Sequence, residues 1–336
     1  MPTGAAACCK TAMLIRLLLL CASLAAFPAQ ASYLEHPRAP QLIQELEELG
    51  VPAAYTRPLL QSAQLRPELI AAERNSAEKT KTWPEYLSIF LQPKRIQGGL
   101  AFWSAQQHWL EQAHSRYGIP PEVIVAIIGV ETLYGGYTGP HRILDSLATQ
   151  GLDHPTRQPF FYNELKEFIR LCHERGFDGL ELKGSYAGAM GLSQFMPSNY
   201  RRLAVDFDED GKVDLWNPAD AIGSTAHYLT AYRGPGKGWQ PGMPVLVAAV
   251  GQADANWPRN PKQPSHSYGQ MSQQLTAIPG IPAQAAVGLI ELDNQPGIER
   301  WFGLQNFYNL MAYNPRVYYA MAVYRLSRAI ADQQQR

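Results

Sequence analysis

The segment PEVIVAIIGVETLYGG, residues 121–136, predicts a helix that is apolar on every face. Pro121 suits the first position of a helix, because the N–H that proline lacks would have no partner there. The residues from Val123 to Val130 are all uncharged, so apolar side chains point in every direction around the helix. We therefore expect a helix buried on all sides, with Glu131 near its C-terminal end and the two following glycines as its stop.

The position of Glu131 predicts a carboxyl group that is still partly protonated near neutral pH. Burial disfavours the carboxylate, and so does the partial negative charge at the C-terminus of a helix, so both effects raise the pKa of Glu131. A carboxylic acid in this state can protonate a glycosidic oxygen as a general acid. The alternative is a structural acid that pairs with an arginine such as Arg142 or caps a neighbouring helix.

Glycoside hydrolysis by the usual scheme needs a second carboxylate at a defined distance from the first. Several acids follow Glu131 along the chain, and none of them lies in a comparably apolar segment. They are Asp145, Asp153, Glu164, Glu167, Glu174, Asp178 and Glu181. The sequence therefore nominates one catalytic carboxylate and not two.

The segment GSYAGAMGLSQFMPS, residues 184–198, predicts the wall of a binding cleft. Its small residues let a polymeric ligand approach the backbone closely. Ser185 and Gln194 can hydrogen-bond to sugar hydroxyls or amides, while Tyr186 and Phe195 can stack on sugar faces. The alternative is a tight contact between helices, formed by the glycine and alanine residues.

The segment DFDEDGKVD, residues 206–214, matches the first nine positions of a calcium-binding loop. The candidate ligands in this segment are Asp206, Asp208, Asp210, the backbone carbonyl of Lys212, and Asp214. At the twelfth position Asn217 replaces the usual glutamate, so Asp220 would complete the coordination instead. We expect calcium to stabilise this loop without taking part in the chemistry, and a solvated acidic turn is the alternative.

The first 31 residues have the pattern of a secretory signal peptide. Lys10 and Arg16 precede a leucine-rich apolar run, and Ala29-Gln30-Ala31 offers a small-x-small cleavage site. Cleavage there would leave 305 of the 336 residues and a single cysteine, Cys172, so the mature chain could form no internal disulfide. No later run approaches the roughly 18 apolar residues of a membrane helix, so we expect a soluble periplasmic protein. The alternative is a lipoprotein attached to a membrane through Cys21.

The composition is that of a globular protein, with 46% hydrophobic and 17% charged residues. Its 29 basic residues balance 29 acidic ones, which excludes a basic surplus for nucleic-acid binding. Because the predicted signal peptide carries two basic residues and no acids, the mature chain would have a formal charge of −2.

We expect a mainly α fold of the α+β class, with segments of distinct character. They are an N-terminal helical domain over residues 32–115, a catalytic core over 116–235 that contains the acidic loop 206–220, a small β-rich element over 240–300, and a C-terminal segment over 301–336. Within these segments, apolar spacing predicts helices over 41–49 and 99–116, the second capped by Gly118. Asn314-Pro315 predicts the start of a final helix that returns to the core.

Three motifs occur in order along the chain: GVET at 129–132, AGAMG with QFMPS between 187 and 198, and the acidic loop followed by LWNPADAIGS at 215–224. Together they closely resemble the lytic murein transglycosylase B family, from about residue 97 to the C-terminal helix. The resemblance implies a lysozyme-like α+β core with an additional helical domain and a small β domain. It also implies cleavage of the bond between N-acetylmuramic acid (MurNAc) and N-acetylglucosamine (GlcNAc) in peptidoglycan.

The resemblance further implies a single catalytic glutamate, so that no second carboxylate is needed. Glu131 would protonate the glycosidic oxygen and then accept the proton of the muramoyl C6 hydroxyl, whose attack closes a 1,6-anhydro ring. The residues that match the family's substrate contacts are Ser185, Gln194, Tyr228, Tyr313 and Asn314. Those that match its calcium ligands are Asp206, Asp208, Asp210, Lys212 and Asp220. The chain departs from the expected pattern at Pro315, where we would expect a small polar residue.

From this resemblance we expect a monomer that acts on peptidoglycan glycan strands, with calcium as a structural cofactor. Cell-wall synthesis enzymes are candidate partners, and nucleic acid is not. Two alternatives stay open at this point. One is a hydrolytic muramidase with an unrecognised second carboxylate, and the other is a non-catalytic peptidoglycan-binding scaffold.

Overall fold

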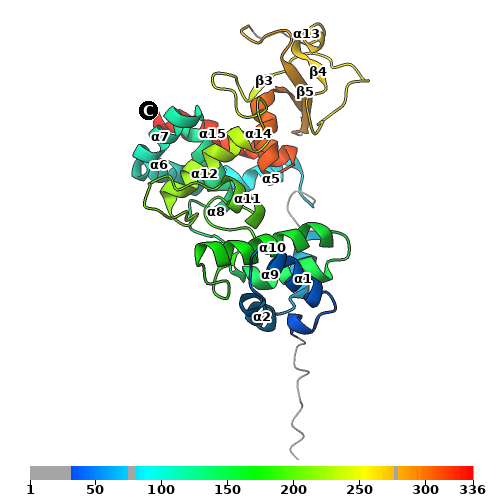
Figure 1. The fold of residues 1–336 in the computed structure, drawn as a ribbon. Coiled ribbons are helices and arrows are strands. Elements are labelled where there is room, and N and C mark those ends of the chain that lie inside the picture. The colour runs from blue at the N-terminus through cyan, green and yellow to red at the C-terminus, as the bar shows by residue number, and fades with distance from the viewer. Residues whose placement is uncertain (1–31, 75–79, 276–278, 295, 336) are drawn as a thin grey trace, which may run out of the picture. The chain divides into compact units, whose positions relative to one another are not determined.

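The computed structural model describes residues 32–74, 80–275, 279–294 and 296–335. The predicted signal peptide and Cys21 lie outside the described residues, so both export predictions stay predictions. Residues 32–336 form one unit, built mainly of helices (Figure 1). Among the described residues, no helix has the length and apolar character needed to cross a membrane.

The predicted apolar helix is confirmed as α8 (Pro121–Thr132), which lies at the centre of the larger hydrophobic core. Its residues Val123–Gly129 are all buried. The surrounding helices are α5 (Trp83–Phe90), α6 (Pro93–Ala105), α7 (Gln107–Tyr117), α12 (Pro218–Ala231) and α15 (Val317–Gln334). A helix enclosed in this way is apolar on every face because no face meets water.

The expectation that the two glycines stop α8 is wrong. The helix ends at Thr132, and Leu133 already adopts the left-handed conformation with φ 53°. Tyr134 explains this early stop, since its hydroxyl donates a hydrogen bond to the Arg95 carbonyl (2.8 Å) and its ring lies against Gly129. The chain therefore folds back over α8 before it reaches the glycines.

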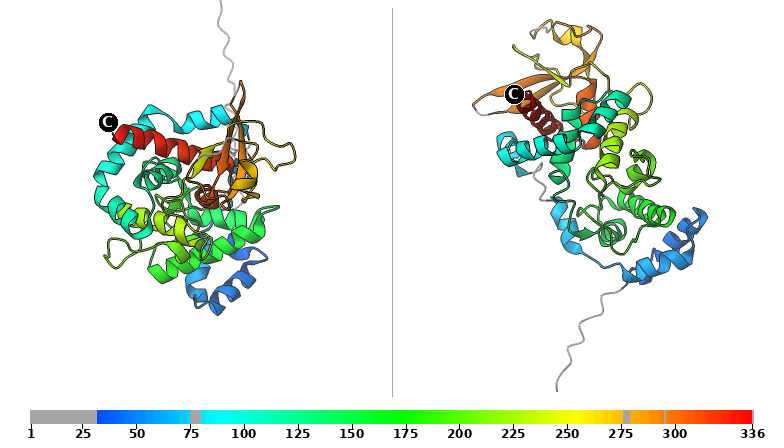
Figure 2. Two further views of the ribbon diagram at one scale, coloured as in Figure 1. Left: turned by 90° about the horizontal axis from the view of Figure 1, so that it is seen from above. Right: turned by 90° about the vertical axis from the view of Figure 1, so that its left-hand side faces the viewer.

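A second hydrophobic core joins the first helices of the chain to the middle of the sequence. Its N-terminal elements are the 3-10 helix Tyr33–Glu35, α1 (Ala39–Glu48) and α2 (Ala53–Ser62), and the next helix along the chain is α3 (Pro67–Arg74). They pack on α9 (Ile143–Asp153) and α10 (Gln158–Arg175), and the views in Figures 1 and 2 place these helices together. Residues 32–115 thus contribute to two hydrophobic cores, while the predicted domain boundaries stay predictions.

The single helix expected over residues 99–116 is wrong, because α6 and α7 are separated at Gln106. The Gln106 N–H is shared between the carbonyls of Phe102 and Trp103, which tightens the last turn of α6 and redirects the chain. Each helix still buries its own apolar face. Gly118 caps α7 in the left-handed conformation, as predicted.

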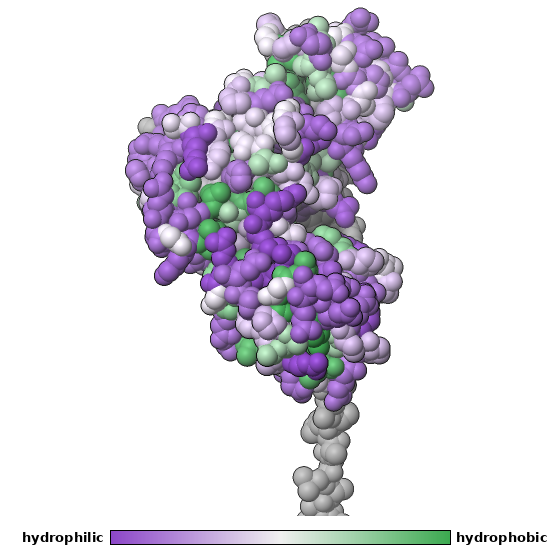
Figure 3. All heavy atoms as spheres, in the orientation of Figure 1, coloured by the Kyte–Doolittle hydropathy of each residue, from purple (hydrophilic) through white to green (hydrophobic). Residues whose placement is uncertain are grey.

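The small β-rich element predicted over residues 240–300, for which long loops were the alternative, forms a four-stranded antiparallel sheet in the order β3-β6-β5-β4. The strands are β3 (Leu246–Ala248), β4 (His266–Ser267), β5 (Ala286–Asp293) and β6 (Ile298–Gly303). With the short helix α13 (Tyr268–Met271) they enclose a small core of their own. Figure 3 shows a largely hydrophilic face over both this sheet and the helices, interrupted by small apolar patches.

The chain returns to the central core through α14 (Gln305–Tyr313) and α15, which packs against α8. The expectation that Asn314-Pro315 begins the last helix is wrong, since α15 starts at Val317. Asn314 is instead extended at the end of α14, with φ −139° and ψ 120°. A residue before proline is pushed towards the β region by the proline ring, which accounts for this conformation.

Candidate active site

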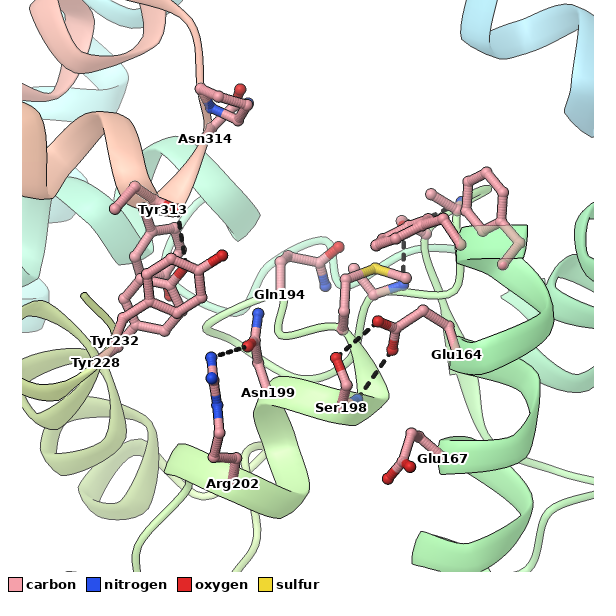
Figure 4. A pocket seen from close by; sticks show the side chains of 18 of the residues that line it. Glu164, Glu167, Gln194, Ser198, Asn199, Arg202, Tyr228, Tyr232, Tyr313 and Asn314 are labelled. Atoms are coloured by element: carbon pink, nitrogen blue, oxygen red, sulfur yellow. Dashed lines mark hydrogen bonds between the residues drawn. The ribbon is translucent and has the colours of Figure 1, made fainter. Parts of the chain in front are cut away.

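Glu131 lines a cavity of about 1020 Å³ between α10, α12 and the loop after α14. In Figure 4, Tyr228, Tyr232 and Tyr313 form one wall and Glu164 and Glu167 of α10 lie opposite. Most of the predicted site residues line this one cavity. They are Glu131, Ser185, Tyr186, Gln194, Tyr228, Tyr313 and Asn314. The structure thus gathers residues from four separate segments of the sequence around one carboxyl group.

A tyrosine of the last helix holds the Glu131 side chain. The hydroxyl of Tyr319 donates a hydrogen bond to Oε1 of Glu131 over 2.6 Å. Tyr319 is buried between α8 and α15, and both its burial and the adjacent Glu131 charge raise the pKa of its phenol well above the ordinary value. It therefore stays a hydrogen-bond donor at every physiological pH. Sequence reasoning missed Tyr319, although a tyrosine on the buried face of the last helix needs a partner for its hydroxyl.

Tyr313 is the second tyrosine close to Glu131. Its hydroxyl donates to the Ser193 carbonyl over 2.6 Å, and its ring is nearly parallel to that of Tyr319, with 6.4 Å between centroids. Burial, followed by the charge of Glu131, raises the pKa of Tyr313 well above its ordinary value. The aromatic side chains thus enclose the carboxyl group on the side of the last two helices.

The structural alternative that pairs Glu131 with Arg142 finds no support. Arg142 forms an ion pair with Asp145 over 2.6 Å and donates to the side chain and the carbonyl of Ser62. Its guanidinium group therefore joins α9 to the end of α2. The raised pKa of Glu131 itself stays a prediction.

Hydrogen bonds within the loop 184–196 fix its predicted cleft residues. Ser185 Oγ accepts from the N–H groups of Ala187 (3.3 Å) and Ala189 (3.0 Å). Gln194 adopts a left-handed backbone conformation, and its amide donates to the carbonyls of Thr138 and Gly191. The small residues also allow close packing, since a Cβ on Gly191 would lie 2.4 Å from Leu215. The segment therefore lies along the cavity and packs closely against the neighbouring chain, but it is not a helix, and its binding of a ligand stays a prediction.

The prediction that Phe195 stacks on a sugar face is wrong. Phe195 is only 2% exposed and packs behind Tyr228 and Tyr313, at centroid distances of 5.3 and 5.9 Å. It is buried because the turn before α11 (Pro197–Leu203) directs its ring into the second core. Tyr232, which the sequence did not single out, lies in the cavity and stacks on Tyr228 at 4.5 Å. Tyr228 itself is held by a hydrogen bond to the Ala312 carbonyl (2.7 Å).

The expectation that no other acid has a comparably apolar setting is also wrong. Glu164 lines the same cavity and is only 3% exposed. Its two oxygens accept hydrogen bonds from the N–H (2.9 Å) and the hydroxyl (2.6 Å) of Ser198, so it caps the N-terminus of α11. Burial nevertheless raises the pKa of Glu164. The burial of Glu164 could not be predicted from the sequence, because its hydrogen-bond partner Ser198 lies on a different helix.

Three acids of the predicted calcium loop converge. Carboxylate oxygens of Asp206, Asp208 and Asp220 lie within 4.8 Å of one another. Asp220 is only 1% exposed and accepts from the N–H groups of Phe207 (2.6 Å) and Asp214 (2.7 Å). Burial and the neighbouring acids raise its pKa, so a cation would relieve an unfavourable cluster of like charges.

Asp210 and Lys212 lie beside this cluster, at the exposed tip of the loop. Oδ1 of Asp210 accepts from the Lys212 N–H over 2.8 Å, which orders the turn. Asn217, which replaces the usual glutamate, instead caps α12 and donates to Asp208 over 2.6 Å. All candidate donors are oxygen atoms, the ligands that calcium prefers. A metal role for Asp210 and Lys212 stays a prediction.

Comparison with protein families shows which family the chain belongs to. Residues 35–328 match the family described as the transglycosylase SLT domain. The chain belongs to this family. Within it, the chain is 38% identical over 315 residues to the membrane-bound lytic murein transglycosylase B of Escherichia coli K12, covering 89% of this chain and 84% of the relative. It is therefore a member of the lytic murein transglycosylase B family and an enzyme of that class.

Solved structures of transglycosylases have the same lysozyme-like fold. The Escherichia coli lytic transglycosylase Slt35 in complex with calcium superposes with a TM-score of 0.80 at 37% identity, covering 90% of this chain and 95% of that one. SltB3 of Pseudomonas aeruginosa in complex with NAG-anhNAM-pentapeptide gives 0.74 at 27% identity, covering 87% and 78%. The expected fold class is confirmed. Because the family is one of enzymes, its membership argues against the alternative of a non-catalytic scaffold.

Proposed function

We propose that this transglycosylase cleaves the β-1,4 bond between MurNAc and GlcNAc without water and leaves 1,6-anhydro-MurNAc ends. Glu131 would act as the only acid and base. The observation that carries the proposal is the Glu131 carboxyl group, which opens into the cavity and is held from behind by Tyr319. The complex of SltB3 with NAG-anhNAM-pentapeptide supports an anhydro product.

In the proposed reaction, protonated Glu131 gives its proton to the glycosidic oxygen as the bond to GlcNAc breaks. The N-acetyl group of the muramoyl residue stabilises the cationic centre at C1. The Glu131 carboxylate then takes the proton of the C6 hydroxyl, and the C6 oxygen bonds to C1 to close the 1,6-anhydro ring. The proton that Glu131 loses in the first step returns in the second, so no water is consumed.

The surroundings of the other acids favour this route over hydrolysis. A second carboxylate that attacks the sugar or activates water must be ionised and accessible. The two oxygens of Glu164 are engaged by Ser198, and its burial favours the neutral acid. Glu167 is paired with Arg170 and Arg201. Neither acid has the free carboxylate that a muramidase of the usual kind requires.

The remaining cavity residues would bind and orient the glycan. We propose that Ser185, Gln194 and Asn314 hydrogen-bond to its N-acetyl and hydroxyl groups, since all three line the cavity. Tyr186 and Tyr313 line it as well and would supply aromatic surfaces for the sugar rings, while the buried Tyr228 would support the exposed ring of Tyr232. The stacked Tyr232 extends this aromatic wall towards solvent.

We also propose that Asp206, Asp208 and Asp220 hold a calcium ion, with Asp210 and the Lys212 carbonyl as further ligands. The convergence of three carboxylates and the burial of Asp220 support this proposal, as does the calcium complex of Slt35. Calcium would stabilise the loop between α11 and α12. Because this loop leads directly into α12, it would help to place Tyr228 at the cavity.

For localisation we propose export through a signal peptide that is cleaved after Ala31. The membrane-bound relative supports the lipoprotein alternative through Cys21. The intact mass of the mature chain distinguishes the two, since lipidation adds acyl groups to an N-terminal cysteine. We further propose that the mature enzyme is a monomer whose main partner is peptidoglycan.

The function is tested by release of soluble glycan from purified peptidoglycan. We expect Glu131→Gln to abolish release, with a melting temperature equal to or above that of the wild type, because a neutral amide replaces a partly buried acid. Glu164→Gln is the matched control, a buried acid of the same cavity, and should retain activity. Activity in Glu131→Gln, or equal loss in both variants, would contradict the proposed role of Glu131.

A further inference from the structure

Thr132 follows Glu131 at the last position of α8, and it is only 1% exposed although its side chain is polar. Its hydroxyl accepts a hydrogen bond from the Gly135 N–H over 3.0 Å and donates to the Leu192 carbonyl over 3.1 Å. A threonine in a helix ordinarily donates to the carbonyl four residues earlier, and the Ile128 carbonyl does lie 3.2 Å away. The bond to Leu192 is the additional one, because it joins the end of α8 to the loop before α11.

The backbone of Leu192 is held from both sides. Its N–H donates to the Leu215 carbonyl over 2.8 Å, while its carbonyl accepts from the Thr132 hydroxyl. Buried backbone groups that are both bonded leave a chain little freedom to shift. Gln194, which lines the cavity, follows two residues later. The position of Gln194 relative to the end of α8 is therefore set through Thr132.

The backbone carbonyl of Thr132 holds a second segment of the cavity region. It accepts from the Tyr137 N–H over 2.9 Å. The carbonyl of the next residue, Thr138, accepts from the side-chain amide of Gln194 over 3.1 Å. A closed ring of contacts thus runs from Thr132 through Leu192, Gln194, Thr138 and Tyr137 back to Thr132. The side chain and the carbonyl of one residue fix both segments to the helix that carries the acid.

The same two segments meet again further along the chain. Strand β1 (His141–Arg142) pairs antiparallel with β2 (Lys183–Gly184), which begins the loop. Gly139 has φ 106°, and a Cβ there would lie 2.0 Å from the Gly184 carbonyl oxygen, so the approach requires glycine. The strand pair therefore fixes one end of the loop, and the Thr132 hydroxyl fixes the end that carries Gln194.

We propose that Thr132 is a positioning residue for the transglycosylase reaction, whose hydroxyl fixes the separation between Glu131 and Gln194. This inference rests on the proposed function of the same site. The acid and the glycan-binding residue come from different segments, and a misplacement of about 1 Å between such groups can lower a rate roughly a hundredfold. Thr132 lies outside the lining of the cavity, so it acts through its neighbours and not by contact with the glycan.

The proposal is tested by the rate of soluble glycan release at several peptidoglycan concentrations. Thr132→Val keeps the branched shape but neither donates nor accepts a hydrogen bond, and we expect kcat to fall about tenfold with KM within about twofold of the wild type. Thr132→Ser keeps the hydroxyl and should restore kcat to within about threefold. Thr132→Cys, whose thiol is a weak donor, should lie between them. The rates are compared at a temperature at which circular dichroism shows every variant folded.

Thr149→Val is the matched control. Thr149 is also buried, and its hydroxyl also joins two segments, since it accepts from the Arg66 N–H over 2.9 Å and donates to the Gln64 carbonyl over 3.4 Å. Both valine variants should melt below the wild type, because each loses buried hydrogen bonds. Only Thr132→Val should lose kcat, since a role in stability alone would leave the rate of the folded enzyme unchanged.

Three results would overturn the role of Thr132. They are wild-type kcat in Thr132→Val, an equal loss of kcat in Thr149→Val, and a raised KM with unchanged kcat, which would indicate weaker binding alone. None of these results bears on the proposed function, provided that the wild-type products carry muramoyl ends one water lighter than reducing ends. Reducing ends from the wild-type enzyme would instead contradict the proposed function.

Discussion

Replacing Tyr319 by phenylalanine removes a single oxygen atom from the support of Glu131. The hydroxyl donates the 2.6 Å hydrogen bond to Oε1 and lies outside the lining of the cavity, so the substitution leaves the substrate surface unchanged. A hydrogen bond to a charged group contributes about 1.5 to 3 kcal/mol, and Glu131 is charged once it has given its proton to the glycosidic oxygen. If this bond holds the catalytic rotamer, its loss lowers kcat by roughly tenfold to a hundredfold.

The assay is the rate of soluble glycan release at several substrate concentrations, which separates kcat from KM. We expect kcat to fall and KM to stay near the wild-type value, because Tyr319 orients the acid without contacting the glycan. Tyr318→Phe is the matched control on the same helix, since Tyr318 packs against Trp83 and Tyr86 away from Glu131. A kcat of Tyr319→Phe within twofold of the wild type would refute the positioning role.

Two further predictions concern stability. Calcium at a hundredfold excess over its dissociation constant should stabilise the fold by about 2.7 kcal/mol and raise the melting temperature by several degrees. Asp208→Ala should remove this increment. A melting temperature that calcium and chelator leave unchanged would contradict the calcium site and favour the solvated acidic turn. Burial raises the pKa of Glu164 in the folded state, so the folded chain binds the proton more tightly and loses stability as the pH rises above the ordinary value of 4.5. Glu164→Gln removes this dependence, so its melting temperature relative to the wild type should be higher at pH 7 than at pH 4; an equal difference at both pH values would contradict the burial argument.

Local patterns in the sequence predicted the elements that hold the candidate site residues. The continuous apolar run before Glu131 could only be a buried helix, and α8 has that character. The spacing of acids after residue 206 placed three carboxylates around one point. In both cases the signal lies within fifteen residues of contiguous chain, so it is readable without knowledge of the tertiary structure.

Three of the errors arose where distant segments meet. Phe195 is buried by tyrosines from two later helices, and Glu164 is satisfied by Ser198 on a neighbouring one. Tyr319 reaches Glu131 across 188 positions of sequence. The break between α6 and α7 at Gln106 has no proline or glycine that would have predicted it. Such features depend on tertiary packing, which local propensity and periodicity do not encode.

The muramoyl ends of the products test the central claim most directly. Peptidoglycan is digested with the wild-type enzyme, and the soluble fragments are analysed by mass spectrometry before and after reduction with borohydride. The single acid–base mechanism predicts ends that are one water lighter than reducing MurNAc and that do not react with borohydride. Reducing MurNAc ends would show that water attacks C1, and would contradict the role assigned to Glu131 as the only acid and base.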